Sequence, residues 1–289
     1  KGWTIDVGPP PSPSVETIVL TTTSTSNAWS PFLIENAGST LKWAVTGGVT
    51  IAEVEIDDPT FDLSGNTGVA TITITSDLGF AGLTELDFWN DNDIGSEITT
   101  LDVSNADELE RLNTRFNLLT TLDVSQNVAL DRLIVRGNAL LTGNLDISTN
   151  VLLDRIQADG TAITSISVAN NPLLDDVRLY NAQLTSAVLD QVLIDLDGHG
   201  LSNGNLEIRN NAEGLTSASL AAYTSLIGKG WTIDVGPPQG VETIVLTTTS
   251  TSNAWSPFSV VNSGHRNITR LNSSQPCNEY AVFFSKNGV

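Results

Sequence analysis

Three aspartates recur at regular spacing in the middle of the chain, and their carboxylates are the first groups that could do chemistry. Asp102, Asp123 and Asp146 each follow a leucine in a Leu-Asp-Val-Ser or Leu-Asp-Ile-Ser motif. If these motifs form neighbouring strands about 4.8 Å apart, the carboxylates make a ladder. Carboxylates at that spacing repel one another unless a cation, a hydroxyl group or a raised pKa relieves them. The pattern predicts either a weak cation site, with calcium as the ion, or a solvated ladder beside Thr and Ser hydroxyls.

A second set of motifs carries most of the arginines and lies between the aspartate motifs. An acidic row runs beside these arginines, so an intramolecular lattice of Arg and carboxylate groups is one interpretation of the pattern. The other interpretation is a recognition surface for an acidic sugar or a protein, because Arg and Tyr are enriched at such surfaces. The candidate binding residues are Arg115, Arg136, Arg155, Arg178 and Tyr180.

The sequence offers no arrangement that favours catalysis. The two histidines, His199 and His265, stand apart, and neither a His-Glu-x-x-His motif nor a phosphate-binding glycine loop is present. Carboxylate pairs can hydrolyse glycosides, but acidic residues are so common here that pairs carry no information. The segment Asp91–Glu97 invites a calcium interpretation, yet its spacing departs from an EF-hand loop. We therefore expect a non-enzymatic protein without a cofactor, and a polar turn at Asp91–Glu97.

Repeats must position both sets of candidate residues. Each series of motifs recurs about every 21–23 residues, and the two are offset by half a period. A period in this range, with Leu-x-x-Leu-x-Leu and recurring Asn, indicates a leucine-rich-repeat solenoid. Each half-repeat is too short to make a full turn, so we expect two short parallel strands per turn, on opposite sides. The aspartate motifs begin at Ile98, Leu119, Thr142 and Ile163, and the arginine motifs at Leu109, Leu130, Leu153 and Leu174.

The two-residue period of a strand assigns the core of the repeats. One side should be lined by Leu101, Val103, Leu122, Val124, Leu145, Ile147, Ile166 and Val168. The other side should be lined by Leu112, Thr114, Leu133, Val135, Ile156, Ala158, Val177 and Leu179. Buried backbone groups at the bends need partners, which we expect from the side chains of Asn117, Asn127, Asn138, Asn150 and Asn171.

Different patterns flank the repeats. The alternation over Val15–Ser76 predicts antiparallel strands in a small β-sandwich-like cap, with Trp29, Phe32 and Trp43 in its core. After the regular coils, apolar residues at helical spacing predict a helix that Thr185 or Ser186 caps and Gly198 ends. A second helix should end at Gly228 and be followed by a closing strand, Gly-Trp-Thr-Ile-Asp-Val.

The chain also contains a long duplication. The string at Lys1–Pro10 returns unchanged at Lys229–Pro238, and the string at Val15–Phe32 returns at Val241–Phe258. We interpret the chain as a window on a tandem array. Residues 1–14 are then a closing strand and proline-rich linker, 15–82 the cap, 83–236 the solenoid, and 237–289 a linker and the start of a further, divergent or truncated β module.

Composition narrows the partners. The net charge of −20 repels nucleic-acid phosphates and anionic lipids, so we expect no nucleic acid as partner. The sequence contains no apolar run long enough for membrane insertion. One cysteine, Cys277, cannot build a disulfide framework. A chain without methionine is expected to be processed or to be a piece of a longer protein.

The coils resemble the 21-residue bacterial leucine-rich repeats of Bacteroidetes surface proteins, on the pattern Leu-x-x-Leu-Asp-Val-Ser-x-Asn-x-x-Leu-x-x-Leu. The stretch Leu184–Val235 is similar to the terminal repeats of such proteins and of some phage-associated structural proteins. The resemblance implies that this chain has one of the roles found in such proteins, which are adhesins, ligand-binding modules and components of arrays. We expect an extracellular or cell-surface tandem-repeat protein for adhesion or for a surface or filament structure, with self-association end to end. The alternatives are a receptor-like module that binds a glycan or protein through the arginine motifs, and a phage virion structural protein.

Overall fold

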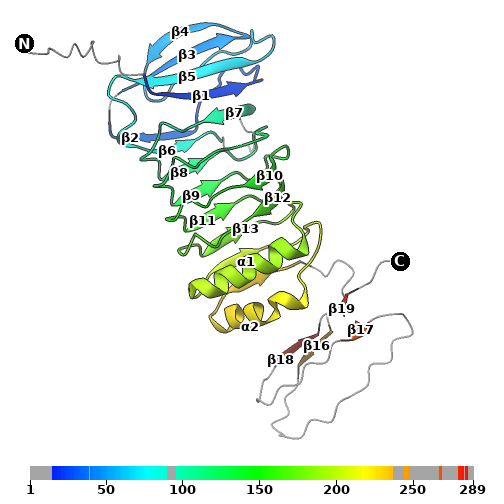
Figure 1. The fold of residues 1–289 in the computed structure, drawn as a ribbon. Helices are drawn as coiled ribbons and strands as arrows, with labels where there is room; N and C mark the ends of the chain where they lie inside the picture. The colour runs from blue at the N-terminus through cyan, green and yellow to red at the C-terminus, as the bar shows by residue number, and fades with distance from the viewer. Residues whose placement is uncertain are drawn as a thin grey trace, which may run out of the picture.

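The computed structural model describes residues 15–38, 40–89 and 96–236, and beyond them only the backbone of four short strands. These are β16 (Ile244–Thr247), β17 (Asn267–Ile268), β18 (Glu279–Val282) and β19 (Phe284–Ser285). The predictions for residues 1–14, for most of the Asp91–Glu97 segment and for the side chains after Gly236 lie outside the described residues. The described chain is rich in β-structure with two α-helices, and its sheets are open (Figure 1).

An antiparallel sheet of five strands forms the N-terminal cap. Alternating apolar and polar residues bury one face of it, where Ile18, Trp43 and Ile74 are fully inaccessible. Trp29 is buried as predicted, but Phe32 is 45% exposed and packs edge-on against Trp89, so its assignment to the core was wrong. The strand order is β4 (Ile51–Glu55), β3 (Leu41–Gly47), β5 (Ala70–Ser76), β1 (Thr17–Thr22) and β7 (Ile98–Asp102).

The arginine motifs supply four of the seven parallel strands of the longest sheet, in which the strands stack coil upon coil (Figure 1). The register places Leu86, Leu112, Leu133, Ile156 and Val177 side by side, and all five are buried. An eighth strand, β2 (Leu33–Asn36), comes from the cap and pairs antiparallel with the first of the seven. The parallel strands are β6 (Leu83–Asp87), β8 (Arg111–Asn113), β9 (Arg132–Ile134), β11 (Arg155–Gln157), β13 (Asp176–Arg178), β14 (Asn205–Glu207) and β15 (Thr232–Asp234).

The opposite side of the coils differs from the expected continuous row of parallel strands. Only β10 (Thr142–Leu145) and β12 (Ala162–Ile166) pair in parallel there. The first motif, β7, instead pairs antiparallel with β1 of the cap, where Leu20 lies opposite Leu101. Residues 119–123 form no strand, and the backbone N–H of Leu119 is bound by a side chain, Oδ1 of Asn138, at 3.1 Å. The coils therefore have strands throughout one side and in places on the other.

Buried asparagines connect each coil to the next. Nδ2 of Asn150 donates to the backbone oxygens of Val124 (3.0 Å) and Asn127 (2.8 Å), in the preceding coil. Asn171 does the same one coil later, with bonds to Ile147 and Asn150. All five predicted asparagines are at most 2% exposed and bond to backbone groups, which confirms that prediction. The predicted core residues are buried as well, except that Leu122 is only partly buried.

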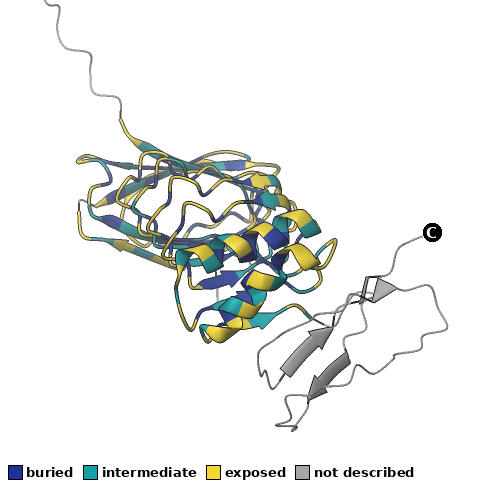
Figure 2. Ribbon diagram, turned by 60° about the horizontal axis from the view of Figure 1, so that its bottom comes forward, coloured by how far each residue is buried: buried dark blue, intermediate teal, exposed yellow. Residues whose placement is uncertain are grey.

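Two helices follow the regular coils and lie side by side at the end of the stack (Figures 1 and 2). Helix α1 (Ser186–His199) ends at His199 and is capped by Gly200 in the left-handed conformation, so the prediction that it ends at Gly198 was one residue short. Thr185 is the N-cap residue, but its side chain accepts no cap hydrogen bond. The Ser186 backbone N–H donates to Oε2 of Glu213 at 2.8 Å. Helix α2 (Leu220–Gly228) ends at the predicted glycine and is preceded by a 3₁₀ turn, Ser217–Ser219.

Replacing Asn150 with Ala should destabilise the protein by about 2–4 kcal/mol, because two buried carbonyl groups lose their donor. The exposed Asn170 provides a matched control, since its one bond to Ser148 is 3.3 Å long and lies at the surface. We expect Asn170→Ala to change the free energy of unfolding by less than about 0.5 kcal/mol. Urea unfolding of both variants checks this, and equal effects would contradict a special role of the buried asparagines.

Candidate functional site

The outward residues of the parallel strands form the surface that the sequence singles out, here called the arginine face. The strand register puts its first row in the order Glu85, Arg111, Arg132, Arg155, Asp176 and Asn205. Two residues along, the second row reads Asp87, Asn113, Ile134, Gln157, Arg178, Glu207 and Asp234. Two residues further along the chain, a third row contains Trp89, Arg115, Arg136, Asp159, Tyr180 and Arg209. Four of the five candidate residues belong to the second and third rows.

The C-terminal half of this face is a chain of ion pairs that runs across the strands. Nε of Arg155 lies 2.8 Å from Asp176, whose other oxygen lies 3.2 Å from Nε of Arg178. Arg178 also reaches Glu207, at 3.5 Å. From Glu207 the pairing continues to Arg209, at 3.0 Å, and from there to Asp234. The guanidinium groups therefore neutralise carboxylates of neighbouring coils.

Arg136 and Tyr180 meet at a buried carboxylate. The side chain of Asp159 is only 2% exposed, and its Oδ2 lies 3.0 Å from Nε of Arg136. The Tyr180 hydroxyl lies near the same carboxylate and lowers its pKa, as Arg136 does. Arg136 also lies over the ring of Phe116, with Cζ 5.4 Å from the ring centroid. These contacts hold two candidate binding residues against their own sheet.

Arginines also lie over aromatic rings at both ends of the face. Cζ of Arg115 is 3.2 Å from the ring centroid of Trp89, and Cζ of Arg209 is 4.1 Å from that of Tyr180. Such stacking of a cation on a ring is stabilising, and more so where water is excluded. Within the described residues, Arg132 is the arginine of this face with neither an ion pair nor a ring contact.

Burial and charge shift the pKa values of several groups on this face. Burial raises the pKa of the Asp159 carboxyl above its ordinary value, although the Tyr180 hydroxyl and Arg136 act against the shift. Burial likewise raises the pKa of Asp87 near the N-terminal end of the face. The pKa of Tyr180 is raised by burial and by the neighbouring Asp159. None of these side chains opens into either of the two cavities described below.

The structure adds residues that the sequence reasoning did not include in the candidate site. Arg209, Glu207 and Asp234 continue the ion-pair chain beyond Arg178, and Trp89 lies under Arg115. Helix α1 lies between β13 and the next strand, β14, and makes this repeat longer than the others. A search for motifs at a fixed spacing therefore does not reach Glu207. The strand Asn-Leu-Glu-Ile-Arg nevertheless keeps the alternation that places Glu207 and Arg209 outward.

On the opposite side, the three aspartates of the predicted ladder do not lie on neighbouring paired strands, and each is bonded to its own backbone. The first carboxylate oxygen of Asp102, Asp123 and Asp146 accepts the N–H two residues on, at 2.9–3.0 Å. These backbone bonds hold the pKa values of Asp123 and Asp146 below the ordinary range. The described part of the chain contains no group of three or more His, Cys, Asp and Glu side chains placed to hold a metal ion.

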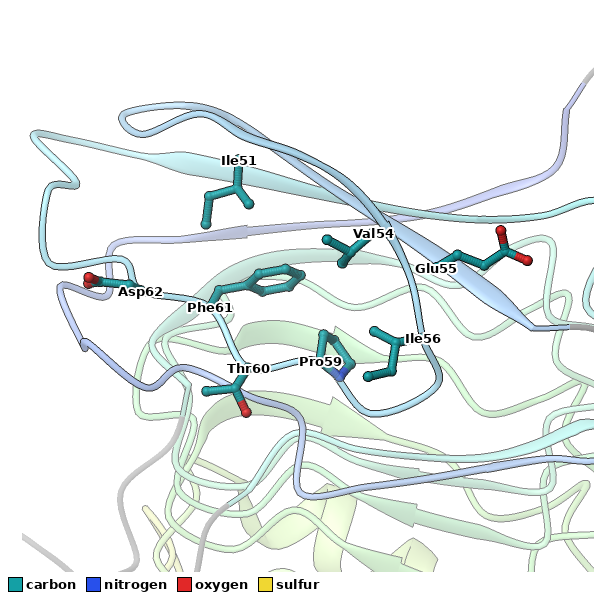
Figure 3. Close-up of a pocket in the computed structure, with 8 residues that line it drawn as sticks. All are labelled: Ile51, Val54, Glu55, Ile56, Pro59, Thr60, Phe61 and Asp62. Atoms are coloured by element: carbon teal, nitrogen blue, oxygen red, sulfur yellow. The ribbon is translucent and has the colours of Figure 1, made fainter.

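Two open cavities occur away from the arginine face. One of about 550 Å³ lies in the cap beside the edge strand β4, where Val54, Ile56, Pro59 and Phe61 surround one space (Figure 3). The other, of about 370 Å³, lies between β7 and residues 119–123, where the strand row is interrupted, and includes Asp102 and Asp123. Neither contains a histidine or cysteine that could act as a nucleophile or base.

Comparison with known proteins gives one distant structural relationship. No protein-family model and no curated protein matches the chain. The functional domain of InlJ from Listeria monocytogenes, a leucine-rich-repeat protein that includes a cysteine ladder, aligns with 26% sequence identity and a TM-score of 0.36. The alignment covers 44% of this chain and 31% of the InlJ chain, so it spans less than a third of that structure. Within the described residues, no helix has the length and hydropathy needed to cross a membrane.

The raised pKa of Asp159 predicts a pH dependence of stability that Asp159→Asn removes. As pH rises from the unfolded value of 3.8 through the higher folded pKa, the folded protein must ionise a buried carboxyl, so the free energy of unfolding falls. The stability of the wild type relative to the Asn variant should therefore decrease with rising pH, by about 1.4 kcal/mol for each pH unit that separates the folded from the unfolded pKa. Urea unfolding between about pH 3.5 and 7 checks this. A constant difference would show that the carboxyl is not perturbed.

Proposed function

We propose that this chain is a non-enzymatic leucine-rich-repeat protein of an extracellular or cell-surface tandem array, serving adhesion or a surface or filament structure. The ion-pair chain from Arg155 to Asp234 supports the proposal most directly, because it neutralises the arginine face internally. Such pairing makes the coil stack a rigid body with fixed spacing between its ends. The same sequence stands before and after the coil stack. Such a duplication is expected where modules of one kind follow one another in a row.

Electron microscopy tests this function. We expect the full chain to form extended particles or strings that grow with protein concentration, because end-to-end contacts between separate chains form more often as the chains are crowded. Light scattering on the same samples gives the mass of the particles. A compact monomer at every concentration would count against the structural role.

The arginine face also favours a second candidate, a receptor-like module for a glycan or protein. The side chains of Arg136, Arg155 and Arg178 are still 34–37% exposed while paired, so their outer edges can contact a ligand. Arg is suited to planar, bidentate recognition of carboxylates. A ligand on this face would therefore carry acidic groups.

Changing Arg136 and Arg178 to Glu should abolish any binding to cells or to a glycan array, because both charges reverse on the same face. Lys42→Glu makes the same change on the cap, where Lys42 pairs with the exposed Asp77, and should leave binding intact. Melting curves must show that all variants are folded, since Arg136 contacts the buried Asp159. Binding that persists in the double variant would contradict the receptor interpretation.

A further inference from the structure

The strand that closes the coil stack is present twice in this sequence. Lys229–Pro238 contains β15, the last strand of the parallel sheet, which pairs with β14 through Thr232, Ile233 and Asp234. Lys1–Pro10 repeats all ten residues of this string. The residues of β15 that bind it to the coil stack are therefore present a second time, at the start of the sequence.

Trp231 is the anchor of this strand. It is 3% exposed, and its Nε1 donates to the backbone oxygen of Leu201 at 3.0 Å. Its ring covers Gly204 so closely that a Cβ at that glycine would lie 2.6 Å from ring atoms. The site thus accepts one large flat side chain over a residue that must be glycine.

Charged residues and glycines on either side of the anchor complete the docking site. Nζ of Lys229 donates to a carboxylate oxygen and the backbone oxygen of Asp197, at 2.7 and 2.8 Å, near the end of α1. At the other end, Asp234 pairs with Arg209. Gly230 and Gly236 have φ of +84° and +68°, values that favour glycine. The same five residue types that make these contacts stand at Lys1, Gly2, Trp3, Asp6 and Gly8.

We propose that Lys1–Gly8 docks into the β15 site of a second copy of this chain, so that copies join head to tail by strand exchange. The proposal rests on the proposed structural function and names its partner. The segment cannot reach the site in its own chain. Six strand spacings place β15 about 29 Å from β6, and the cap lies beyond β6 (Figure 1), whereas the seven residues from Gly8 to Val15 span at most about 25 Å.

Exchange replaces each contact of β15 with an identical one from another molecule. The balance between closed and exchanged forms therefore depends on concentration rather than on contact quality. The chain's own strand, β15, follows α2 directly. Its effective concentration at the site therefore exceeds the millimolar effective concentrations that short flexible linkers give. Dilute wild-type protein is closed, and exchange follows when copies are crowded or β15 is displaced. A head-to-tail contact of this kind does not close on itself and extends into a chain.

Trp231→Ala weakens the strand in its own chain while leaving Trp3 available to a neighbour. We expect this variant to form oligomers whose mass and melting temperature rise with protein concentration. The double variant Trp3→Ala/Trp231→Ala should remain monomeric and melt at one temperature throughout. Size-exclusion chromatography with light scattering, together with melting curves, compares the two. Identical behaviour of both variants at every concentration overturns the proposal.

A milder variant and a peptide keep the test decisive if Trp231→Ala does not fold. Trp231→Phe keeps an aromatic side chain at the site and loses the Nε1 bond to Leu201 together with part of the indole that covers Gly204. It is a milder change than Ala, and the same comparison is made with Trp3 present or replaced. The peptide KGWTIDVGPP should raise the melting temperature of the double variant, whereas KGATIDVGPP should not. Equal effects of the two peptides contradict a specific site. Strings formed equally by wild type and by Trp3→Ala would overturn strand exchange and leave the structural function standing.

Discussion

The structure depends on hydrogen bonds from buried asparagine side chains to the backbone at the bends of the coils. Bends expose N–H and C=O groups that no strand can pair, and a buried group left without a partner costs about 1–3 kcal/mol. Asn127, Asn150 and Asn171 each donate to two carbonyl groups of the preceding coil. These bonds fix the distance and register between coils. The strand ladder, the apolar core and the rows of surface residues all follow from that register.

Register also explains why the arginine face is neutral within itself. Residues at equivalent positions of neighbouring coils are one strand spacing apart, which is the reach of an arginine side chain to the next carboxylate. Arg155, Asp176 and Arg178 form one such group, and Arg136 reaches Asp159 one coil on. A face built in this way keeps most of its charges in fixed pairs. It suits a protein whose task is to hold a shape more than one whose charges must rearrange around a substrate.

Much of this architecture could be predicted from the sequence, because repetition shows the inward positions several times over. The core residues of the coils and the role of the asparagines were predicted in this way, and the buried Leu112, Leu133 and Ile156 are examples. The period of the repeats could not show that other groups compete with the neighbouring coil for the backbone hydrogen bonds of a motif. The edge of the cap sheet captured the first aspartate motif as β7, and Asn138 bound Leu119 where a strand was expected. Pairing across coils, such as that of Arg178 with Glu207, depends on how far α1 displaces the next strand.

The cap and the coil stack each contribute a strand to the other's sheet, β2 in one direction and β7 in the other. This interlocking has a mechanical consequence for a row of modules under tension. A pull that enters at Val15 acts first on β1, which is hydrogen-bonded to β5 on one side and to β7 on the other. The load therefore spreads over two ladders and passes into the first coil through β7. A module built in this way resists stretching at its junction without any covalent crosslink.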